Sequence, residues 1–236
     1  MRDFRMKVVA LIPARKGSKR VSQKNVREVL GQPLVVFSLK AAKICKDIEK
    51  IFVSTDDPIV SKISKKFGIE VLQRPSELAT DSASTFEVIK HSYQIIKNDY
   101  KISPEFLILL QPTSPLRAMN FISRGLSQII EDPKASCLIA LCEYRFFSGK
   151  ISNGYWISDY PEDTRSQDLN PFYVPSGSLY IYRCSETIEK NDAFGKNVKP
   201  FLVDPALNVN IDHERDFVHL NVIYENHKKE FSYLLK

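Results

Sequence analysis

The sequence is poor in the residues that mark disulfide-rich, zinc-binding or membrane-spanning proteins. Its 236 residues include four cysteines without a CxxC pair, which argues against a disulfide framework. The four histidines share no metal-ligand spacing, and neither HExxH nor GxSxG occurs. No apolar run approaches the ~20 residues of a membrane helix. We therefore expect no zinc site and no membrane span, with at least three of the four cysteines buried as small hydrophobic residues.

We also expect that the start of the chain is not a secretory leader. The stretch MRDFRMKVVALIPAR begins with charges, but its apolar part is too short for a leader and no small-residue cleavage site follows it. The apolar and charged fractions, 43% and 26%, are those of an ordinary globular protein. We expect a cytoplasmic protein, and its length suits one substantial α/β domain.

Acidic residues are absent from positions 15–27, whereas basic residues crowd there. The basic residues are Arg15, Lys16, Lys19, Arg20, Lys24 and Arg27. Together with a formal net charge of +6, they indicate an anionic partner. A nucleic-acid binder more often spreads its basic residues over several elements and interleaves aromatics. Crowding in one loop favours a small polyphosphate over a nucleic acid, with a solvated basic loop as the alternative.

Apolar runs alternate with amphipathic stretches along the chain. Strand patterns occur at 7–12, 51–54, 71–72, 106–110, 135–142, 178–182 and 200–203, and helical patterns at 34–44, 58–67, 86–96, 122–130 and 213–235. This alternation predicts an α/β fold with a mostly parallel sheet and helices on both faces. Residues 143–175 are rich in aromatics, proline, asparagine and aspartate and show no sustained period. We expect a single domain over 1–236 with 143–175 as an inserted segment.

Ligands of open α/β sheets bind beyond the carboxyl ends of the strands, so the segments that follow strands are the candidates for chemistry. The first is IPARKGSKRVSQKN at 12–25. Its Arg15, Ser18, Lys19 and Lys24, with the backbone N–H groups around Gly17, could cradle a triphosphate. The segment is neither a Walker A loop nor a GxGxxG turn.

Two further segments follow later strands. In QRPSELATDSAST at 73–85, Arg74 is a candidate phosphate partner. A serine or threonine there could cap the next helix, and the backbone could also meet a base. In LLQPTSPLR at 109–117, two prolines frame a rigid turn that would hold Gln111 and Arg117.

The last candidate segment is NVNIDHERDF at 208–217. Asn210 and Asp212 are two residues apart and would point to the same side of an extended strand end, which suits oxygen ligation of Mg²⁺. Asp212 could equally be the N-cap of the closing helix. Asp56 and Asp57 could also bind a metal, but the sequence STDDP favours a helix start with Pro58 in the first turn.

At these places the sequence resembles the acylneuraminate cytidylyltransferases, also called CMP-sialic acid synthetases, with their legionaminate and pseudaminate relatives. The resemblance rests on IPARKGSKRVSQKN, STD at 54–56, RPSELATDSAS at 74–84 and LLQPTSPLR at 109–117. It implies a Rossmann-like nucleotide-diphosphosugar-transferase fold with a mixed, mostly parallel sheet. It also implies a homodimer in which the 143–175 segment makes the dimer contact and covers the sugar site of the partner.

The resemblance further implies an activity and a set of site residues. The enzyme would transfer CMP from CTP to the anomeric hydroxyl of a sialic-acid-like nonulosonic acid, an acidic 2-keto sugar, and release pyrophosphate with the help of Mg²⁺ or Mn²⁺. Catalytic roles would fall to Arg15, Lys24 and Asp212. Residues that bind CTP would be Arg15, Ser18, Lys24, Asn25, Arg74, Ala83 and Thr85, those near the sugar Gln111, Ser176 and Gly177, and those that hold the metal Asp212 and Asn210.

Three departures from the family pattern lie on the metal and sugar side of this expected site. Asn210 stands where relatives usually have an aspartate, Ser176 precedes Gly177 where they usually have asparagine, and 143–157 lacks the usual His-Pro and Lys. The nucleotide is therefore better defined than the sugar. An eight-carbon Kdo-type acceptor and a catalytically degraded CTP-binding homologue remain alternatives, and a nucleic-acid-binding module is a third.

Overall fold

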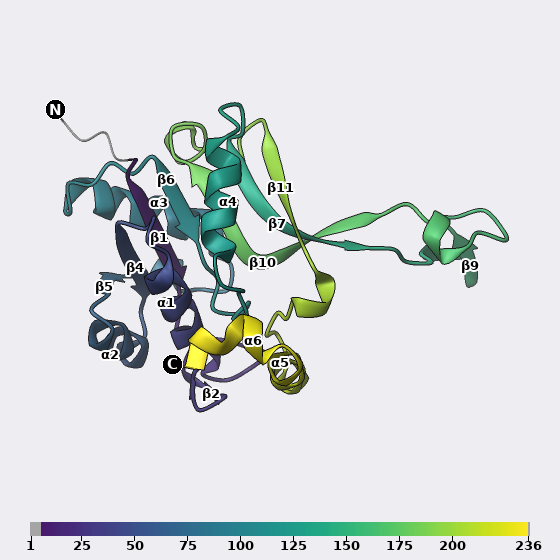
Figure 1. The fold of residues 1–236 in the computed structure, drawn as a ribbon, viewed down its shortest axis with the longest axis horizontal. Coiled ribbons are helices and arrows are strands. Elements are labelled where there is room, and N and C mark those ends of the chain that lie inside the picture. Colours follow the sequence, from purple (N-terminus) through teal and green to yellow (C-terminus); the bar gives the residue numbers. More distant parts are fainter. Residues whose placement is uncertain (1–5, 236) are drawn as a thin grey trace.

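Seven strands form one mixed sheet at the centre of the computed structural model, which describes residues 6–235. Their order is β11-β7-β10-β6-β1-β4-β5 (Figure 1). The bounds are Val8–Pro13 for β1, Lys50–Thr55 for β4, Glu70–Gln73 for β5, Phe106–Leu109 for β6, Cys137–Tyr144 for β7, Phe172–Arg183 for β10 and Val198–Val203 for β11. Strand β10 runs antiparallel to β6 and β7, and the other pairs are parallel. The predicted mostly parallel sheet is confirmed.

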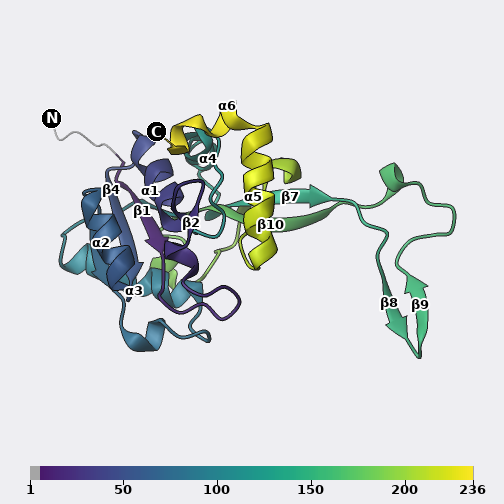
Figure 2. The ribbon, with the colours of Figure 1, turned by 90° about the horizontal axis from the view of Figure 1, so that it is seen from below.

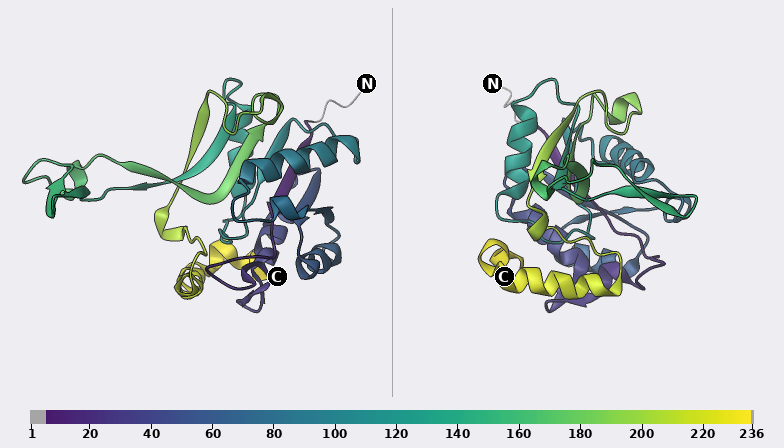
Figure 3. Two further views of the ribbon diagram at one scale, coloured as in Figure 1. Left: turned by 180° about the vertical axis from the view of Figure 1, so that it is seen from behind. Right: turned by 90° about the vertical axis from the view of Figure 1, so that its right-hand side faces the viewer.

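Helices cover both faces of this sheet, as predicted (Figure 3). Their bounds are Leu34–Ile44 for α1, Pro58–Lys66 for α2, Thr85–Asn98 for α3, Phe121–Ile130 for α4, Glu214–Asn226 for α5 and Lys228–Phe231 for α6. Successive side chains of a strand point to opposite faces. Ala10 and Ile12 of β1 therefore pack in the core beneath α1, α4 and α5, whereas Val9 and Leu11 pack with α3.

Local sequence signals set where the helices begin. Asp57 is the N-cap of α2 and accepts a hydrogen bond from Ile59 N at 2.8 Å, with Pro58 in the first turn. The predicted helix start at STDDP is thus confirmed. Ser84 caps α3 in a reciprocal capping box with Glu87, which satisfies two backbone N–H groups at the helix end.

The prediction of one closing helix over 213–235 is wrong, because the chain breaks at His227. Helix α5 ends at Asn226, and α6 and the 3₁₀ turn η6 (Ser232–Leu235) follow in a new direction (Figure 2). The break lets Phe231 and Leu234 enter the core beside α1. The carbonyl of Leu234 also accepts hydrogen bonds from Gln32 Nε2 and Lys40 Nζ, each at 2.8 Å. A straight helix could not bury these side chains.

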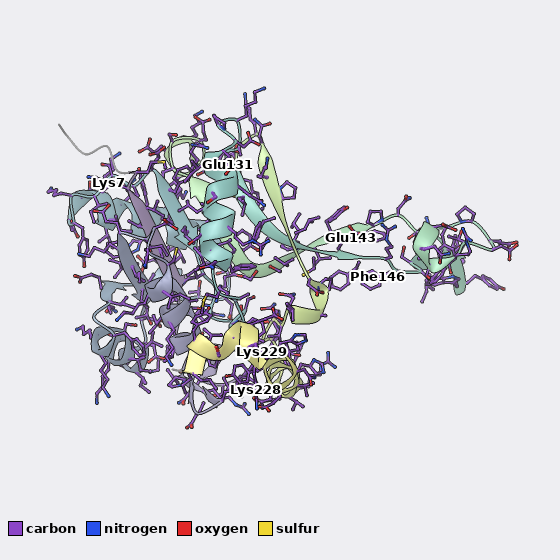
Figure 4. All side chains as sticks on the ribbon, viewed as in Figure 1. Lys7, Glu131, Glu143, Phe146, Lys228 and Lys229 are labelled. Carbon is purple, nitrogen blue, oxygen red and sulfur yellow. The ribbon has the colours of Figure 1, made fainter. Side chains whose placement is uncertain are left out.

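Residues 145–171, in the middle of the predicted inserted segment, form an arm that projects from the sheet (Figures 1 and 2). The ends of β7 and β10 pair antiparallel as a ribbon that leads into it. The arm carries the hairpin of β8 (Gly149–Ser152) and β9 (Tyr155–Ser158) and the 3₁₀ turn η3 (Ser166–Asp168). Figure 4 places Glu143 and Phe146 at its base. Strand β10 begins six residues earlier than the predicted 178, because exposed ribbon residues show no burial period.

The remaining short elements connect these parts. The pair β2 (Glu28–Val29) and β3 (Gln32–Pro33) leads into α1, and the other 3₁₀ turns are η1 (Lys24–Val26), η2 (Ser76–Leu78), η4 (Ile188–Lys190) and η5 (Pro205–Leu207). All four cysteines are buried and free, as expected. Within residues 6–235, every helix is too short or too polar to cross a bilayer.

Candidate active site

A polar cleft of about 250 Å³ opens where β1, β5 and β6 end. Its walls come from the first three candidate segments of the sequence, which lie far apart along the chain. Eight of the predicted site residues line it: Arg15, Ser18, Lys24, Asn25, Arg74, Ala83, Thr85 and Gln111. The parallel strands bring these segments together because their carboxyl ends meet at one edge of the sheet.

The loop after β1 is shaped by hydrogen bonds to its own backbone. Asn25 Nδ2 donates to the carbonyl of Arg15 at 2.9 Å, and the N–H of Lys16 donates to Asp56 Oδ1 at 2.8 Å. Asp56, the alternative metal ligand, thus has a partner in the loop. Lys24 is 8% exposed and donates to the carbonyl of Ile211 at 2.6 Å. The loop therefore holds two cations, Arg15 and Lys24, at defined places.

An aspartate that the sequence analysis did not single out pairs with the cations of this loop. Asp81 forms an ion pair with Arg15, and its other oxygen lies 2.8 Å from Lys19 Nζ. The hydrogen bonds from Lys19 and Arg15 lower the pKa of Asp81 below its usual value. A signal was present in the sequence, since Asp81 lies in a strand-following segment of the same sheet edge as the basic loop.

Arg74 is only 5% exposed and is anchored to β4. It donates from Nε to Ser54 Oγ at 3.1 Å and from Nη2 to the carbonyl of Ser54 at 2.8 Å. Burial lowers the pKa of Arg74 to about 10, and Asp56 partly offsets this while Arg15 adds to it. Arg74 is therefore still charged at neutral pH, and it contributes to the cleft as a fixed cation.

The start of α3 forms another wall of the cleft. Ala83 and Thr85 line it, while the side chain of Ser84 between them caps the helix. The first N–H groups of a helix and its dipole favour an anion at this end. The wall can therefore meet a polar or anionic group through its backbone.

Gly177, one of the two residues that were expected beside the sugar with Gln111, lies directly against the Gln111 side chain. Gly177 has a φ of +75°, and a Cβ added there would lie 2.9 Å from Gln111 Oε1 and 2.6 Å from Ser114 Oγ. Ser176 is only 3% exposed, and its hydroxyl lies 2.6 Å from that of Ser178. The structure thus brings Gly177 to Gln111 but turns the Ser176 side chain into the protein.

Asn210 and Asp212 lie next to the cleft and point to the same side, as predicted. Asn210 Nδ2 donates to Asp212 Oδ2 at 2.9 Å. The other oxygen, Asp212 Oδ1, lies 3.2 Å from Lys24 Nζ and 3.4 Å from Arg20 Nη1. Asp212 is therefore linked to the cleft through Lys24, although Asn210 and Asp212 do not themselves line it.

The alternative role of Asp212 as a helix cap is wrong. The N-cap of α5 is His213. Asp216 Oδ2 accepts hydrogen bonds from the N–H groups of Asp212 and His213, each at 2.7 Å. Because Asp216 satisfies the backbone there, the carboxylate of Asp212 has no part in the helix.

Asn210 and Asp212 offer oxygen ligands of the kind that a magnesium site uses, but two residues are too few to complete such a site. Carboxylate and amide oxygens are the ligands that Mg²⁺ prefers, and it demands six oxygens in octahedral geometry. Over residues 6–235, no group of three or more His, Cys, Asp or Glu could hold a metal ion. The pair therefore fits Mg²⁺ where a phosphate chain and water complete the set.

Comparison with known sequences agrees with this geometry. Residues 9–144, more than half of the chain, match the sequence model of the family described as cytidylyltransferase. The chain belongs to the cytidylyltransferase family.

Several named cytidylyltransferases are similar to this chain. An N-acylneuraminate cytidylyltransferase of Escherichia coli is 31% identical over 91% of this chain and 51% of its own length. A pseudaminic acid cytidylyltransferase of Campylobacter jejuni is 26% identical over 96% of this chain and 100% of its own length. A CMP-N,N'-diacetyllegionaminic acid synthase of Legionella pneumophila is 28% identical over 84% and 88%. The chain thus spans about half the length of the first relative, and the predicted resemblance is confirmed.

Solved structures support the cytidylyltransferase fold. A CMP:2-keto-3-deoxy-manno-octonic acid synthetase complexed with CTP superposes with a TM-score of 0.67 at 18% identity, covering 94% of this chain and 99% of that one. A 4-diphosphocytidyl-2C-methyl-D-erythritol synthase from Anaerococcus prevotii gives 0.65 at 16% identity, covering 93% and 99%. At these identities the likeness shows the fold alone, and it confirms the predicted Rossmann-like α/β architecture.

Proposed function

We propose that this chain transfers CMP from CTP to the anomeric hydroxyl of a sialic-acid-like nonulosonic acid and releases pyrophosphate. The observation that carries the proposal is the cleft, which gathers the fixed cations Arg15, Lys24 and Arg74 within reach of Gln111. The names of the relatives from E. coli, C. jejuni and L. pneumophila support an acceptor of the nonulosonic class.

The nucleotide half of the cleft suits a triphosphate. Arg15 and Lys24 are held by Asp81 and Asp212, two partly exposed aspartates that a phosphate chain can replace as anionic partners. Ser18 and Asn25 complete the phosphate loop, and Arg74 adds a cation from β4. The cytosine would lie against Ala83 and Thr85, where backbone groups can pair with the polar edge of the base.

The acceptor half of the cleft centres on Gln111 and Gly177. Glycine suits position 177 because the Gln111 amide occupies the space that a side chain there would need. Gln111 can offer both a donor and an acceptor to sugar hydroxyl or carboxylate groups. Kdo-type acids remain the alternative acceptor, and the 18%-identical synthetase structure bears on the fold alone.

In the proposed reaction, the anomeric oxygen of the sugar forms a bond to the α-phosphorus of CTP, and the bond from that phosphorus to the bridging oxygen breaks in line. Pyrophosphate takes the bonding electrons, and Arg15 and Lys24 offset the charge that develops on the phosphates. The hydroxyl proton passes to Asp212 or to water beside it. Mg²⁺ or Mn²⁺, held by Asp212, Asn210 and the nucleotide, would supply Lewis-acid stabilisation of the phosphate oxygens.

We also propose that the chain acts as a homodimer through its 143–175 segment. Large apolar side chains of the arm are exposed, among them Ile151 at 79% and Tyr155 at 76%. Such surfaces mark protein interfaces more often than solvent-facing ones. The segment would cover the sugar half of the site of the partner subunit.

The test is pyrophosphate release from CTP with a panel of acceptors: N-acetylneuraminate, N,N'-diacetyllegionaminate, pseudaminate and Kdo. Release that depends on one nonulosonic acid supports the proposal and identifies the acceptor. Release with Kdo alone would show that the acceptor is an eight-carbon Kdo-type acid and not a nonulosonic acid. Binding of CTP without turnover supports a degraded homologue, and absence of CTP binding overturns the proposal.

A further inference from the structure

A buried arginine joins the turn that carries Gln111 to the strand that carries Gly177. Arg117 is 1% exposed. It donates from Nη2 to the carbonyl of Gln111 at 3.0 Å and from Nε to the carbonyl of Ser178 at 2.7 Å. One rigid guanidinium thus fixes the backbone immediately beside both residues of the acceptor half.

Two further hydrogen bonds anchor this arginine to α1 and to the C-terminal segment. Arg117 Nη1 donates to Ser38 Oγ of α1 at 3.1 Å, and the Tyr233 hydroxyl donates to the carbonyl of Arg117 at 2.7 Å. Tyr233 belongs to the segment after the break at His227, which is why the break matters for the site. Arg117, Tyr233 and their hydrogen-bonded partners form what we call the Arg117 bracket.

The charge of Arg117 has no acidic partner among the residues 6–235 that the structure describes. Burial lowers its pKa to about 10, so the guanidinium remains charged at neutral pH. A buried charge is costly unless hydrogen bonds satisfy it, and here carbonyl and hydroxyl groups do so. Any movement of the turn relative to β10 would break these bonds, so the bracket resists that movement.

The bracket holds a close contact between the turn at 111–117 and residues 176–178. Ser114 Oγ of the same turn donates to the carbonyl of Ser176 at 2.9 Å, and Gly177 packs directly against the Gln111 amide. None of the side-chain hydrogen bonds of Arg117 reaches the phosphate loop or the start of α3. The bracket therefore acts on the acceptor half and leaves the nucleotide half to its own contacts.

We propose that Arg117 and Tyr233 are positioning residues that set the affinity of the acceptor half by holding Gln111 against Gly177. This inference rests on the proposed transfer to a sugar acceptor. It differs from a purely structural role in one respect: loss of the bracket raises KM for the sugar while KM for CTP stays the same.

The test compares two bracket variants with a matched arginine elsewhere. Arg117→Lys keeps the charge but loses the planar fork that reaches three partners, and Tyr233→Phe removes one hydroxyl only. Arg183→Lys is the control, because Arg183 also donates to backbone carbonyls, those of Ala135, Ile129 and Asp132, at the far end of β10. Steady-state kinetics give KM for both substrates with the acceptor found by the panel, and thermal melts give stability.

We expect KM for the sugar to rise about tenfold in Arg117→Lys and several-fold in Tyr233→Phe, with KM for CTP changed less than about twofold. Arg183→Lys should lower the melting temperature without changing either KM. Equal changes in both KM values, or a sugar KM as unaffected as in Arg183→Lys, would overturn the inference. If Arg117→Lys does not fold, Tyr233→Phe decides by the same criteria.

Hydrogen exchange separates this inference from the proposed function. In Tyr233→Phe, amide exchange should speed up within 111–117 and 176–178 but not within 15–25. Unchanged exchange in the first two stretches contradicts the bracket whatever the enzyme does. If exchange changes as expected but no acceptor supports turnover in the wild-type protein, the proposed function has failed and the positioning role falls with it, while the geometry of the bracket stands.

Discussion

Individual charges in and beside the cleft are paired across segments that are distant in the sequence. Asp81 lies opposite Arg15 and Lys19, and Asp212 lies opposite Arg20 and Lys24. These pairs are partly exposed, so solvent screens them and each contributes little to stability. Their consequence is geometric, since they hold the cations in place; in the proposed reaction a phosphate chain would replace the aspartates as their partner.

Removal of a single cleft cation should therefore affect catalysis and not folding. Arg15→Ala and Lys24→Ala should each lower kcat/KM by roughly 10²-fold or more, because each takes a fixed positive charge away from the developing negative charge. Steady-state kinetics with CTP as the varied substrate measure the effect. Lys46→Ala, on the surface outside the cleft, serves as the control. Unchanged kcat/KM in both cleft variants would show that the loop is only a surface feature.

Gly177 is the glycine whose replacement should affect the acceptor half most directly. In Gly177→Ala the Cβ would overlap Ser114 Oγ and press on the Gln111 amide, in addition to the backbone strain at a φ of +75°. We expect KM for the sugar to rise at least tenfold with little change in KM for CTP.

Gly68→Ala is the matched control for this change. Its φ is +68°, but nothing lies within 4 Å of the added Cβ. It should cost roughly 1 kcal/mol of stability from left-handed backbone strain and leave both KM values unchanged. If the two alanine variants behave alike, Gly177 serves the fold and not the acceptor.

Among the elements, the arm is the one whose large apolar side chains are left exposed in a single chain. Trp156 and Tyr155 of β9 are 57% and 76% exposed, and the four residues of this strand are all exposed. A hairpin with one apolar surface and no sheet beneath it is not stable by itself in water. A second copy of the chain supplies the missing cover in the proposed dimer.

Light scattering at micromolar concentration tests the assembly. We expect the wild-type protein to be a dimer and the double variant Tyr155→Ser, Trp156→Ser to be mostly monomeric, because it removes the largest aromatic area of the arm. Phe194→Ser is the control, since Phe194 is 44% exposed but lies outside the arm. A monodisperse wild-type monomer contradicts the proposal.

At the scale of the whole molecule, metal binding depends on a long-range contact, because the candidate ligand Asp212 pairs with cations of a different segment. Asp212 already neutralises Lys24 and Arg20, and its neighbour Asn210 carries no charge. A divalent cation would have to compete with both basic side chains for one carboxylate. Magnesium should therefore bind weakly to the free protein and much more tightly together with CTP, whose phosphates add anionic oxygens.

Calorimetric titration of Mg²⁺ with and without CTP tests this expectation independently of turnover. Asn210→Asp should strengthen Mg²⁺ binding in the absence of CTP and lower the Mg²⁺ concentration for half-maximal rate. Asp212→Ala should nearly abolish turnover without loss of stability, because the cap of α5 is made by His213 and Asp216. Asp216→Ala, in contrast, should cost about 1 kcal/mol of stability. If Asp212→Ala keeps most of its activity, the metal ligand must be sought elsewhere, with Asp56 the next candidate.

Much of the fold and of the cleft could be predicted from the sequence because the signals are local or follow from strand direction. The Asp57–Pro58 helix start and the Ser84 capping box depend on residues within four positions of each other. The convergence of segments 12–25, 73–85 and 109–117 follows from parallel strands, whose carboxyl ends share one edge. These three segments line the cleft, whereas Asp56, Asn210 and Asp212, which also follow strands, do not.

Only the tertiary structure decided which arginine does what, because each side chain meets partners that are far away in the sequence. Arg15 reaches Asp81, Arg74 is anchored on Ser54, and Arg117 is buried against Ser178 and Ser38. The sequence predicts Arg15 and Arg74 as phosphate partners and places Arg117 in a rigid turn, but it does not give the partners of any of the three. The break at His227, which brings Tyr233 to Arg117, was likewise decided by burial of Phe231 and Leu234 in the core. Local patterns set the elements, and long-range packing assigned their side chains to the cleft, the sheet or the core.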